Sequence, residues 1–340
     1  MCNHWCWAVF VVLAAAAGPV LAWNNTGHMA MARITFANLS NAQRAALGEI
    51  LEAHPRFADD FEERMPLDVR RSGEAEEWRF AHAATWPDTA RHFGYVKSVQ
   101  AREALVQRYS HRRWHYINLR LSIDARGAYE VAAGSYQVAA GAYQAAAGAL
   151  SQDPEDIVRA LETIRRSWPK ASTAQRAVAL CWLLHLMGDI HQPLHTVMMV
   201  APGTLELGDR GGNEIRVRAG RHGPRNLHAL WDGALGKSIA WQELSDLSQR
   251  LERDQGLPNV PASTDPINFA NWAEQGRALA REAVYGSELR RRLAAQSSRG
   301  EVPDFRPDDA YLERMTAQSR SQIVLAARRA VRVLATLELR

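Results

Sequence analysis

The chain has 340 residues, of which 47% are hydrophobic and 23% are charged, and its formal net charge is +4 at pH 7. This length is enough for one large domain or two ordinary ones, and the composition excludes a mainly disordered chain. The slight positive charge agrees with an anionic substrate but does not identify one.

The first 22 residues differ in composition from the rest of the chain. The run MCNHWCWAVFVVLAAAAGPVLA holds no Asp, Glu, Lys or Arg, and an apolar stretch followed by small residues is typical of a secretory signal peptide. We therefore predict a signal peptide at residues 1–22, cleavage before Trp23, a secreted or periplasmic protein, and no stable membrane association afterwards. An uncleaved membrane anchor is the alternative, because the run only just reaches spanning length.

Cleavage would remove two of the three cysteines, Cys2 and Cys6, and leave Cys181. The mature chain could then form no internal disulfide. We expect an exported protein of this kind to be stabilised by its hydrophobic core, by metal, or by both.

Apolar residues recur at helical spacing in six segments of the chain. In chain order these are residues 41–54, 154–168, 173–191, 239–254, 269–285 and 310–338. The best strand candidate is the short run NEIRVRA at residues 213–219. The sequence predicts an all-α, mostly helical fold with long loops and at most a short β-hairpin, in a single domain over residues 23–340.

Residues 127–150 form a low-complexity insertion, GAYEVAA GSYQVAA GAYQAAA GAL, with Tyr129, Tyr136 and Tyr143 seven residues apart. A helix would bring these tyrosines onto one face, but each glycine would weaken it by roughly 1 kcal/mol. We expect a surface loop or marginal helix without a catalytic role.

The predicted helix at residues 173–191 is apolar on nearly all sides, which indicates that it is buried. It nevertheless runs into the sequence HLMGDIHQPLH, which carries three histidines and an aspartate. Pro193 disfavours helix at Gln192, so we expect the helix to end there and the chain to turn, which lets His195 fold back toward the helix end.

Within this run, His185 and Asp189 lie four residues apart and therefore share one helix face. An unpaired buried carboxylate costs several kcal/mol, and a divalent cation removes that cost. Histidine with aspartate suits zinc. A hydrogen-bonded His–Asp pair in the core is the alternative for this segment taken alone.

Four other segments carry residues that can bind metal in largely apolar surroundings. They are WNNTGH with His28 and the α-amine that cleavage would free, ATWPDTAR with Asp88 and Arg91, RRWHYIN with His115, and NLHALWD with His228 and Asp232.

Other histidines lie outside these motifs. We expect those in polar or Arg-rich surroundings to be solvated, namely His54, His92, His111 and His222.

Together and in this order, the motifs resemble the single-strand-specific zinc nucleases, the S-one/P-one nucleases, which are secreted fungal and plant enzymes with bacterial relatives. The matching motifs are a Trp followed five residues later by His, W-x-D-x-x-R, H-[aromatic]-I, H-x-x-x-D-x-x-x-x-x-H, G-G-N and N-L-H-x-x-W-D. The resemblance runs from Trp23 to about Asp232, and we expect it to include the C-terminal helices. The lack of disulfides and the Ala- and Arg-rich composition favour a bacterial member.

The resemblance implies a phospholipase C/nuclease-like fold that holds three zinc ions. One ion would be bound by Asp88, His115, His185 and Asp189, a second by His195, His228 and Asp232, and the third by the amine and carbonyl of Trp23 with His28 and a bridging Asp189. The third ligand set requires cleavage before Trp23.

The resemblance further implies an endonuclease that hydrolyses single-stranded DNA and RNA to 5′-phosphate products, with 3′-nucleotidase activity, and that is a monomer. Asp88 and Arg91 would be catalytic, with Arg91 facing the phosphate. Tyr116, Asn118 and Asn213 would form a pocket for an unstacked base. Many relatives have Asp where this chain has Asn118, which predicts a broader base preference here.

Two other functions remain open. Zinc phospholipases C share the fold, the three zinc ions and the N-terminal Trp, but they typically carry Glu in place of Asp232 and a longer spacing from Trp to the first His. A non-catalytic zinc-binding interaction protein is the second alternative. It would require that the open coordination positions of the metals be blocked.

Overall fold

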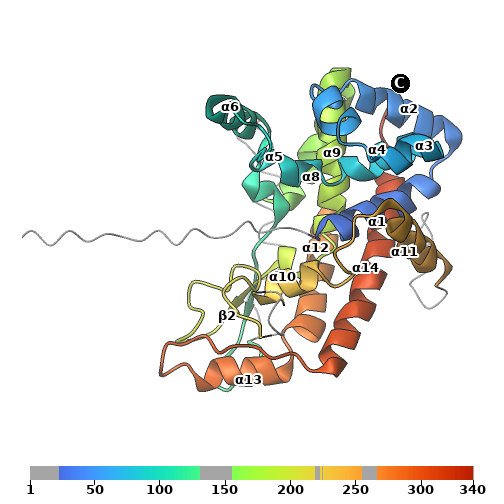
Figure 1. The fold of residues 1–340 in the computed structure, drawn as a ribbon. Coiled ribbons are helices and arrows are strands. Elements are labelled where there is room, and N and C mark those ends of the chain that lie inside the picture. The colour runs from blue at the N-terminus through green and yellow to red at the C-terminus, as the bar shows by residue number, and fades with distance from the viewer. Residues whose placement is uncertain (1–22, 131–154, 219–222, 224, 255–265, 340) are drawn as a thin grey trace, which may run out of the picture.

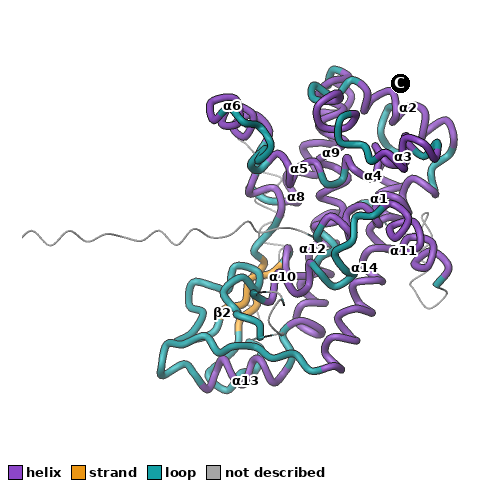
Figure 2. Tube along the Cα trace, in the orientation of Figure 1, coloured by secondary structure: helices purple, strands orange, loops and turns teal. Residues whose placement is uncertain are grey.

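The computed structural model describes residues 23–130, 155–218, 223, 225–254 and 266–339. Helices make up most of this part of the chain, and long loops gather around the two short strands (Figures 1 and 2). The predicted mostly helical fold is therefore confirmed. Among the described helices, none has both the length and the apolar character needed to cross a membrane.

The first half of the described chain contributes a series of short and medium helices and one strand. In chain order these are α1 (Asn25–Ala37), α2 (Asn41–Glu52), the π-turn η1 (Ala58–Glu62), α3 (Leu67–Ser72), α4 (Ala75–Ala83), α5 (Trp86–Ala90), α6 (Val99–Tyr109), the 3-10 turn η2 (Arg112–His115) and β1 (Leu119–Ser122).

The second half contains the longer helices. In chain order the elements are α8 (Ile157–Ser167), η4 (Trp168–Lys170), α9 (Thr173–Asp189), η5 (Pro193–His195), β2 (Val197–Val200), α10 (Leu227–Asp232), α11 (Trp241–Arg253), α12 (Phe269–Leu279), η6 (Ala280–Val284), α13 (Ser287–Ala295) and α14 (Asp309–Ala335).

All six helical segments predicted from periodicity contain a helix, namely α2, α8, α9, α11, α12 and α14. A capping box between Ser172 and Gln175 begins α9. The expected end of this helix is also confirmed, because Gln192 has extended backbone (φ −88°, ψ 116°) just before Pro193.

The sequence analysis missed α1, which supplies part of the site. Every residue from Thr26 to Phe36 is buried, so this helix shows no alternation of apolar and polar faces that periodicity could detect. The side chain of Asn24 caps it by accepting a hydrogen bond from the Gly27 amide at 3.2 Å. The helix packs against α4, α9, α11 and α14.

The small sheet differs from the hairpin that the sequence allowed. β1 and β2 pair in parallel, with Leu119 opposite Val197 and Ser122 opposite Val200. A two-residue turn cannot join parallel strands, and here α8 and α9 lie between them in the chain. The predicted strand at residues 213–219 was wrong, since within its described part only Arg216 and Val217 form isolated bridges.

The buried apolar side chains of the described residues form two clusters. The larger one includes Trp23, Leu47 and Leu184 and joins the helices around α1, α9 and α14. The smaller one includes Met199 of β2 and Tyr285, next to η6.

His54 is not solvated as expected but only 3% exposed, because its ring packs edge-on against Trp86 and Phe61.

Of the low-complexity insertion, the structure describes only residues 127–130, and the remainder lies outside the described residues. Within that part, the Tyr129 hydroxyl lies 2.9 Å from the carbonyl oxygen of Tyr285.

Candidate metal centre

Three groups of buried histidine and aspartate side chains meet at the C-terminal end of α9. Within each group, one candidate ligand atom per residue lies within 4.8 Å of the others. The groups are His28–His185–Asp189, Asp88–His115–His185 and His195–His228–Asp232. They form one continuous centre, because His185 belongs to two groups and Asp189 also lies within 4.0 Å of His195 in the third.

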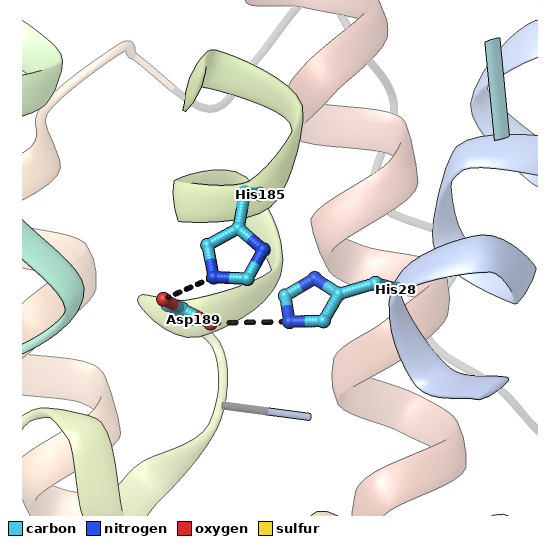
Figure 3. A group of neighbouring side chains, drawn as sticks. All are labelled: His28, His185 and Asp189. Carbon is cyan, nitrogen blue, oxygen red and sulfur yellow. Dashed lines mark ion pairs between the residues drawn. The ribbon is translucent and has the colours of Figure 1, made fainter. Parts of the chain in front are cut away.

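Asp189 lies at the middle of this centre and is fully buried. Its Oδ1 is 3.3 Å from His28 Nε2, and its Oδ2 is 3.2 Å from His185 Nε2 and 3.1 Å from His115 Nδ1. Figure 3 shows His185 and Asp189 projecting from the same helix toward His28 of α1. The four-residue spacing on α9 produces this alignment, as the sequence predicted.

The close approach of α1 to α9 depends on Gly188. A Cβ atom at this position would lie 2.7 Å from His28 Nδ1, so any side chain would displace the imidazole. Trp23 also binds α9 at this position, because its buried indole Nε1 donates a hydrogen bond to the Gly188 carbonyl at 3.0 Å. The start of α1 is also tied to α10 by a hydrogen bond of 3.2 Å from the Asn24 amide to the Asp232 carbonyl.

The second group joins α5, η2 and α9. His185 Nε2 is 2.9 Å from His115 Nδ1 and 3.9 Å from Asp88 Oδ1. Arg91, at the end of α5, borders the group, since its Nε is 3.4 Å from Asp88 Oδ1 and 3.3 Å from His115 Nε2. The W-x-D-x-x-R motif therefore places its aspartate and its arginine at the same centre.

The third group comes from η5 and α10. His228 and Asp232 lie one helical turn apart on α10, with His228 Nε2 3.5 Å from Asp232 Oδ2. His228 Nε2 is also 3.1 Å from His195 Nε2.

Backbone carbonyl oxygens fix the tautomer of three of these histidines. A carbonyl oxygen only accepts, so each Nδ1 carries the proton and each Nε2 directs a lone pair into the centre. Histidines that bind metal are oriented in this way. The contacts are His185 Nδ1 to Ala84 O at 2.8 Å, His195 Nδ1 to His115 O at 2.5 Å, and His228 Nδ1 to Gly211 O at 2.7 Å.

Several polar atoms of the centre have no hydrogen-bond partner within the described chain. They are both ring nitrogens of His28, both carboxylate oxygens of Asp88, and Oδ1 of Asp189. The nitrogens His195 Nε2 and His228 Nε2 also lie 3.1 Å apart, close to the roughly 3.3 Å between two nitrogens on a tetrahedral zinc. Bound cations would satisfy the carboxylate oxygens and one ring nitrogen of each histidine, so the residues fit metal ions.

The electrostatics of the centre agree with this fit. Burial lowers the pKa of His28 and His195, and it lowers the pKa of His115 to about 3, so these imidazoles are neutral, the form that binds metal. Burial alone would raise the pKa of Asp189, but the charge of His185, whose own pKa is raised by Asp189 and Asp88, and the hydrogen bonds from His115 and His185 hold it well below its usual range.

Asp232 has the opposite shift. Burial and then the negative charges of Asp189 and Asp88 raise its pKa well above the usual value, against the opposing effect of its hydrogen bond from Gln192. A cation beside Asp232 would reverse this shift, since positive charge favours the carboxylate.

The residues predicted to form a base pocket lie on two segments next to the centre. Tyr116 is half-buried and Asn118 is exposed. The backbone at Tyr116 is extended, and in an extended segment side chains two residues apart point to the same side. A hydrogen bond of 2.8 Å from the Ile117 amide to the His195 carbonyl holds this segment beside the third group. Asn213 is half-buried and follows the turn that contacts His228.

Sequence reasoning missed residues that hold the candidate ligands in place. Gln192 is fully buried and donates a hydrogen bond of 2.7 Å from Nε2 to Asp232 Oδ1, while its Oε1 accepts from the Leu194 amide at 2.6 Å. Asp209 is also fully buried and binds the turn next to His228. The only sequence feature that could have indicated a role for Gln192 is its polar side chain next to the apolar residues of this motif.

A mostly helical protein in which three buried His–Asp groups adjoin has the build of a multinuclear metalloprotein. Residues 23–338 match the family described as "S1/P1 Nuclease", and the chain belongs to this family of metal-dependent proteins.

Curated relatives from Arabidopsis thaliana match shorter segments. The chain is 47% identical to Endonuclease 5 over 57 residues, which cover 17% of this chain and 16% of that protein. It is 47% identical to Endonuclease 4 over 60 residues, 18% of this chain and 17% of that protein. It is 32% identical to Endonuclease 1 over 110 residues, 32% of this chain and 33% of that protein. These alignments thus span at most about a third of the relatives' length.

Proposed function

We propose that the chain is a zinc-dependent endonuclease that hydrolyses phosphodiester bonds of single-stranded DNA and RNA and leaves 5′-phosphate ends. The observation that carries this proposal is the set of three adjoining His–Asp groups around Asp189, in a member of the S1/P1 nuclease family. The relatives named as endonucleases support the same class of reaction.

The proposed ligands follow the three groups. The first zinc is held by Asp88, His115, His185 and Asp189, the second by His195, His228 and Asp232, and the third by His28, Asp189 and the N-terminal amine and carbonyl of Trp23. Support for zinc comes from the imidazoles and carboxylates that make up the groups. Bound zinc would supply positive charge for the phosphoryl oxygens and make hydroxide available near neutral pH.

The protein's own residues orient the phosphate. Arg91 contacts Asp88 and His115 at 3.4 and 3.3 Å, so its guanidinium lies where it can bind a phosphoryl oxygen and stabilise charge that develops there. Burial of the centre strengthens this interaction, because there is little water to screen it.

Preference for single strands is assigned to Tyr116, Asn118 and Asn213. A base that stacks on Tyr116 must leave its neighbours, which a single strand permits and a duplex resists by a few kcal/mol. The amides of Asn118 and Asn213 can both donate and accept hydrogen bonds, so they can read more than one base edge.

We further propose that the protein is exported as a monomer and cleaved before Trp23. The proposed amine ligand exists only after this cleavage, and the family match also begins at residue 23. The hydrogen bonds from Trp23 to Gly188 and from Asn24 to Asp232 support a position for the new N-terminus beside the centre.

A direct test uses the chain that begins at Trp23, loaded with zinc and freed of excess metal. We expect three zinc ions per chain by elemental analysis and faster cleavage of single-stranded than of double-stranded DNA. RNA and a phosphatidylcholine analogue are assayed in parallel. Hydrolysis of the phospholipid alone would replace the proposal with a phospholipase C, and zinc binding without any hydrolysis would indicate a binding protein.

A further inference from the structure

Asp209 lies outside the three metal-binding groups, yet its buried carboxylate uses all of its hydrogen-bonding capacity. Oδ1 accepts from the amides of Met199 at 2.9 Å and Gly211 at 3.1 Å. Oδ2 accepts from the amide of Gly212 at 2.9 Å and from the hydroxyl of Tyr285 at 2.6 Å. Three of these donors are backbone groups, so the carboxylate fixes the path of the chain and not only the position of a side chain.

The turn that Asp209 binds is strained and needs such a partner. Arg210, Gly211 and Gly212 all have positive φ, at 54°, 63° and 83°. For Arg210, which carries a Cβ atom, this conformation is unfavourable. Successive amides in turns of this kind point the same way and bind an anion, which here is the carboxylate of Asp209.

The turn leads directly to the third metal-binding group. The carbonyl of Gly211 accepts the Nδ1 proton of His228 at 2.7 Å, which leaves His228 Nε2 to face His195 and Asp232. The turn packs closely against η5, because a Cβ atom on Gly211 would lie 2.3 Å from the Leu194 carbonyl oxygen.

The same turn also places Asn213, whose Nδ2 donates to the Arg210 carbonyl at 2.8 Å. Asp209 holds the turn to β2 twice, through Oδ1 and through its own amide, which donates to the Met199 carbonyl at 2.9 Å. β2 pairs with β1, and β1 begins directly after Asn118. Asp209 therefore links the two segments that carry the base-pocket residues.

We infer that Asp209 is a positioning residue, which through the Gly211–Gly212 turn sets the tautomer and orientation of His228 and the place of Asn213. This inference rests on the proposed function for the roles of His228 and Asn213. Tyr285 completes the arrangement, because among the described residues its hydroxyl is the one side-chain donor to Asp209.

The test compares Asp209→Asn with Tyr285→Phe in the chain that begins at Trp23. The carboxamide of Asp209→Asn turns an NH₂ group toward at least one backbone N–H, so the turn loses a bond and gains a repulsion. We expect one of three zinc ions to bind about 10–100-fold more weakly, the range for residues that orient a ligand. Tyr285→Phe keeps the carboxylate and should weaken the same zinc by a smaller factor.

A histidine ¹H–¹⁵N spectrum gives the second measurement. The Nδ1–H signal of His228 should be present in the unaltered chain and weakened or shifted in Asp209→Asn. The control is Leu47→Ala, which creates a cavity in the larger core cluster and lowers the melting temperature without touching the turn. We expect it to keep both the zinc affinity and the His228 signal.

The outcomes separate this inference from the proposed function. Unchanged zinc affinity and an unchanged His228 signal in Asp209→Asn would overturn it, and so would equal changes in Leu47→Ala. If Asp209→Asn does not fold, Tyr285→Phe decides in the same way. Neither measurement needs a substrate, whereas failure of the unaltered chain to cleave single-stranded DNA would refute the proposed function alone.

Discussion

Asp189 is the residue whose replacement should disturb the centre most, because it contacts histidines of all three groups. Asp189→Asn keeps the size of the side chain and removes its negative charge. In the structure that charge lies 3.2 Å from His185 Nε2 and 3.3 Å from His28 Nε2, with both partners fully buried. The variant therefore tests the shared carboxylate with little change in packing.

The expected magnitude follows from burial. Removing one partner of a buried charge pair costs about 3–5 kcal/mol, which for a chain of this size lowers the melting temperature by roughly 5–10 °C. Loss of a ligand shared by two metals should reduce the zinc content below three per chain. Hydrolysis should fall by more than the 10–100-fold that is typical of changes next to a ligand.

The assay measures zinc by elemental analysis, melting by calorimetry, and cleavage of single-stranded DNA on the same preparations. Leu47→Ala serves as the control, because it should lower the melting temperature by a similar amount and retain three zinc ions. Full zinc content together with unaltered hydrolysis in Asp189→Asn would refute the assignment of Asp189 as the central ligand.

Four further predictions concern other parts of the molecule. A chain that retains Ala22 before Trp23 should hold less zinc and cleave more slowly, because an amide is a poor ligand; equal zinc content would exclude the terminal amine. Tyr116→Ala should raise KM for single-stranded DNA about tenfold with zinc content intact, and loss of zinc instead would make Tyr116 a core residue. Gly188→Ala, although alanine favours helix by about 1 kcal/mol, should lower stability and zinc content, since its Cβ would lie 2.7 Å from His28 Nδ1. Burial lowers the pKa of His54 from 6.5 to about 4. Protonation of His54 therefore destabilises the folded state as the pH falls from 6.5 to 4, by at most roughly 3 kcal/mol. Melting temperatures of His54→Asn should therefore depend less on pH between 7 and 4 than those of the unaltered chain.

Local sequence determined most of the helices and the identity of the candidate ligands. The periods of α8 and α14 are visible within windows of a dozen residues, and Pro193 marks the end of the helical run that holds His185 and Asp189. Spacing of four residues was also enough to place His228 and Asp232 on one face of α10, because such pairs lie within a single helical turn.

Tertiary structure decided what lies between these segments. The parallel pairing of β1 with β2, the contact of His28 with Asp189, and the burial of His54 all join residues that are distant in the chain, and no local pattern specifies them. The same holds for Gln192 and Asp209, whose roles depend on the groups they contact at 2.6–3.1 Å. Periodicity records which face of an element is apolar, whereas the partner of a buried polar group is set only when the helices pack together.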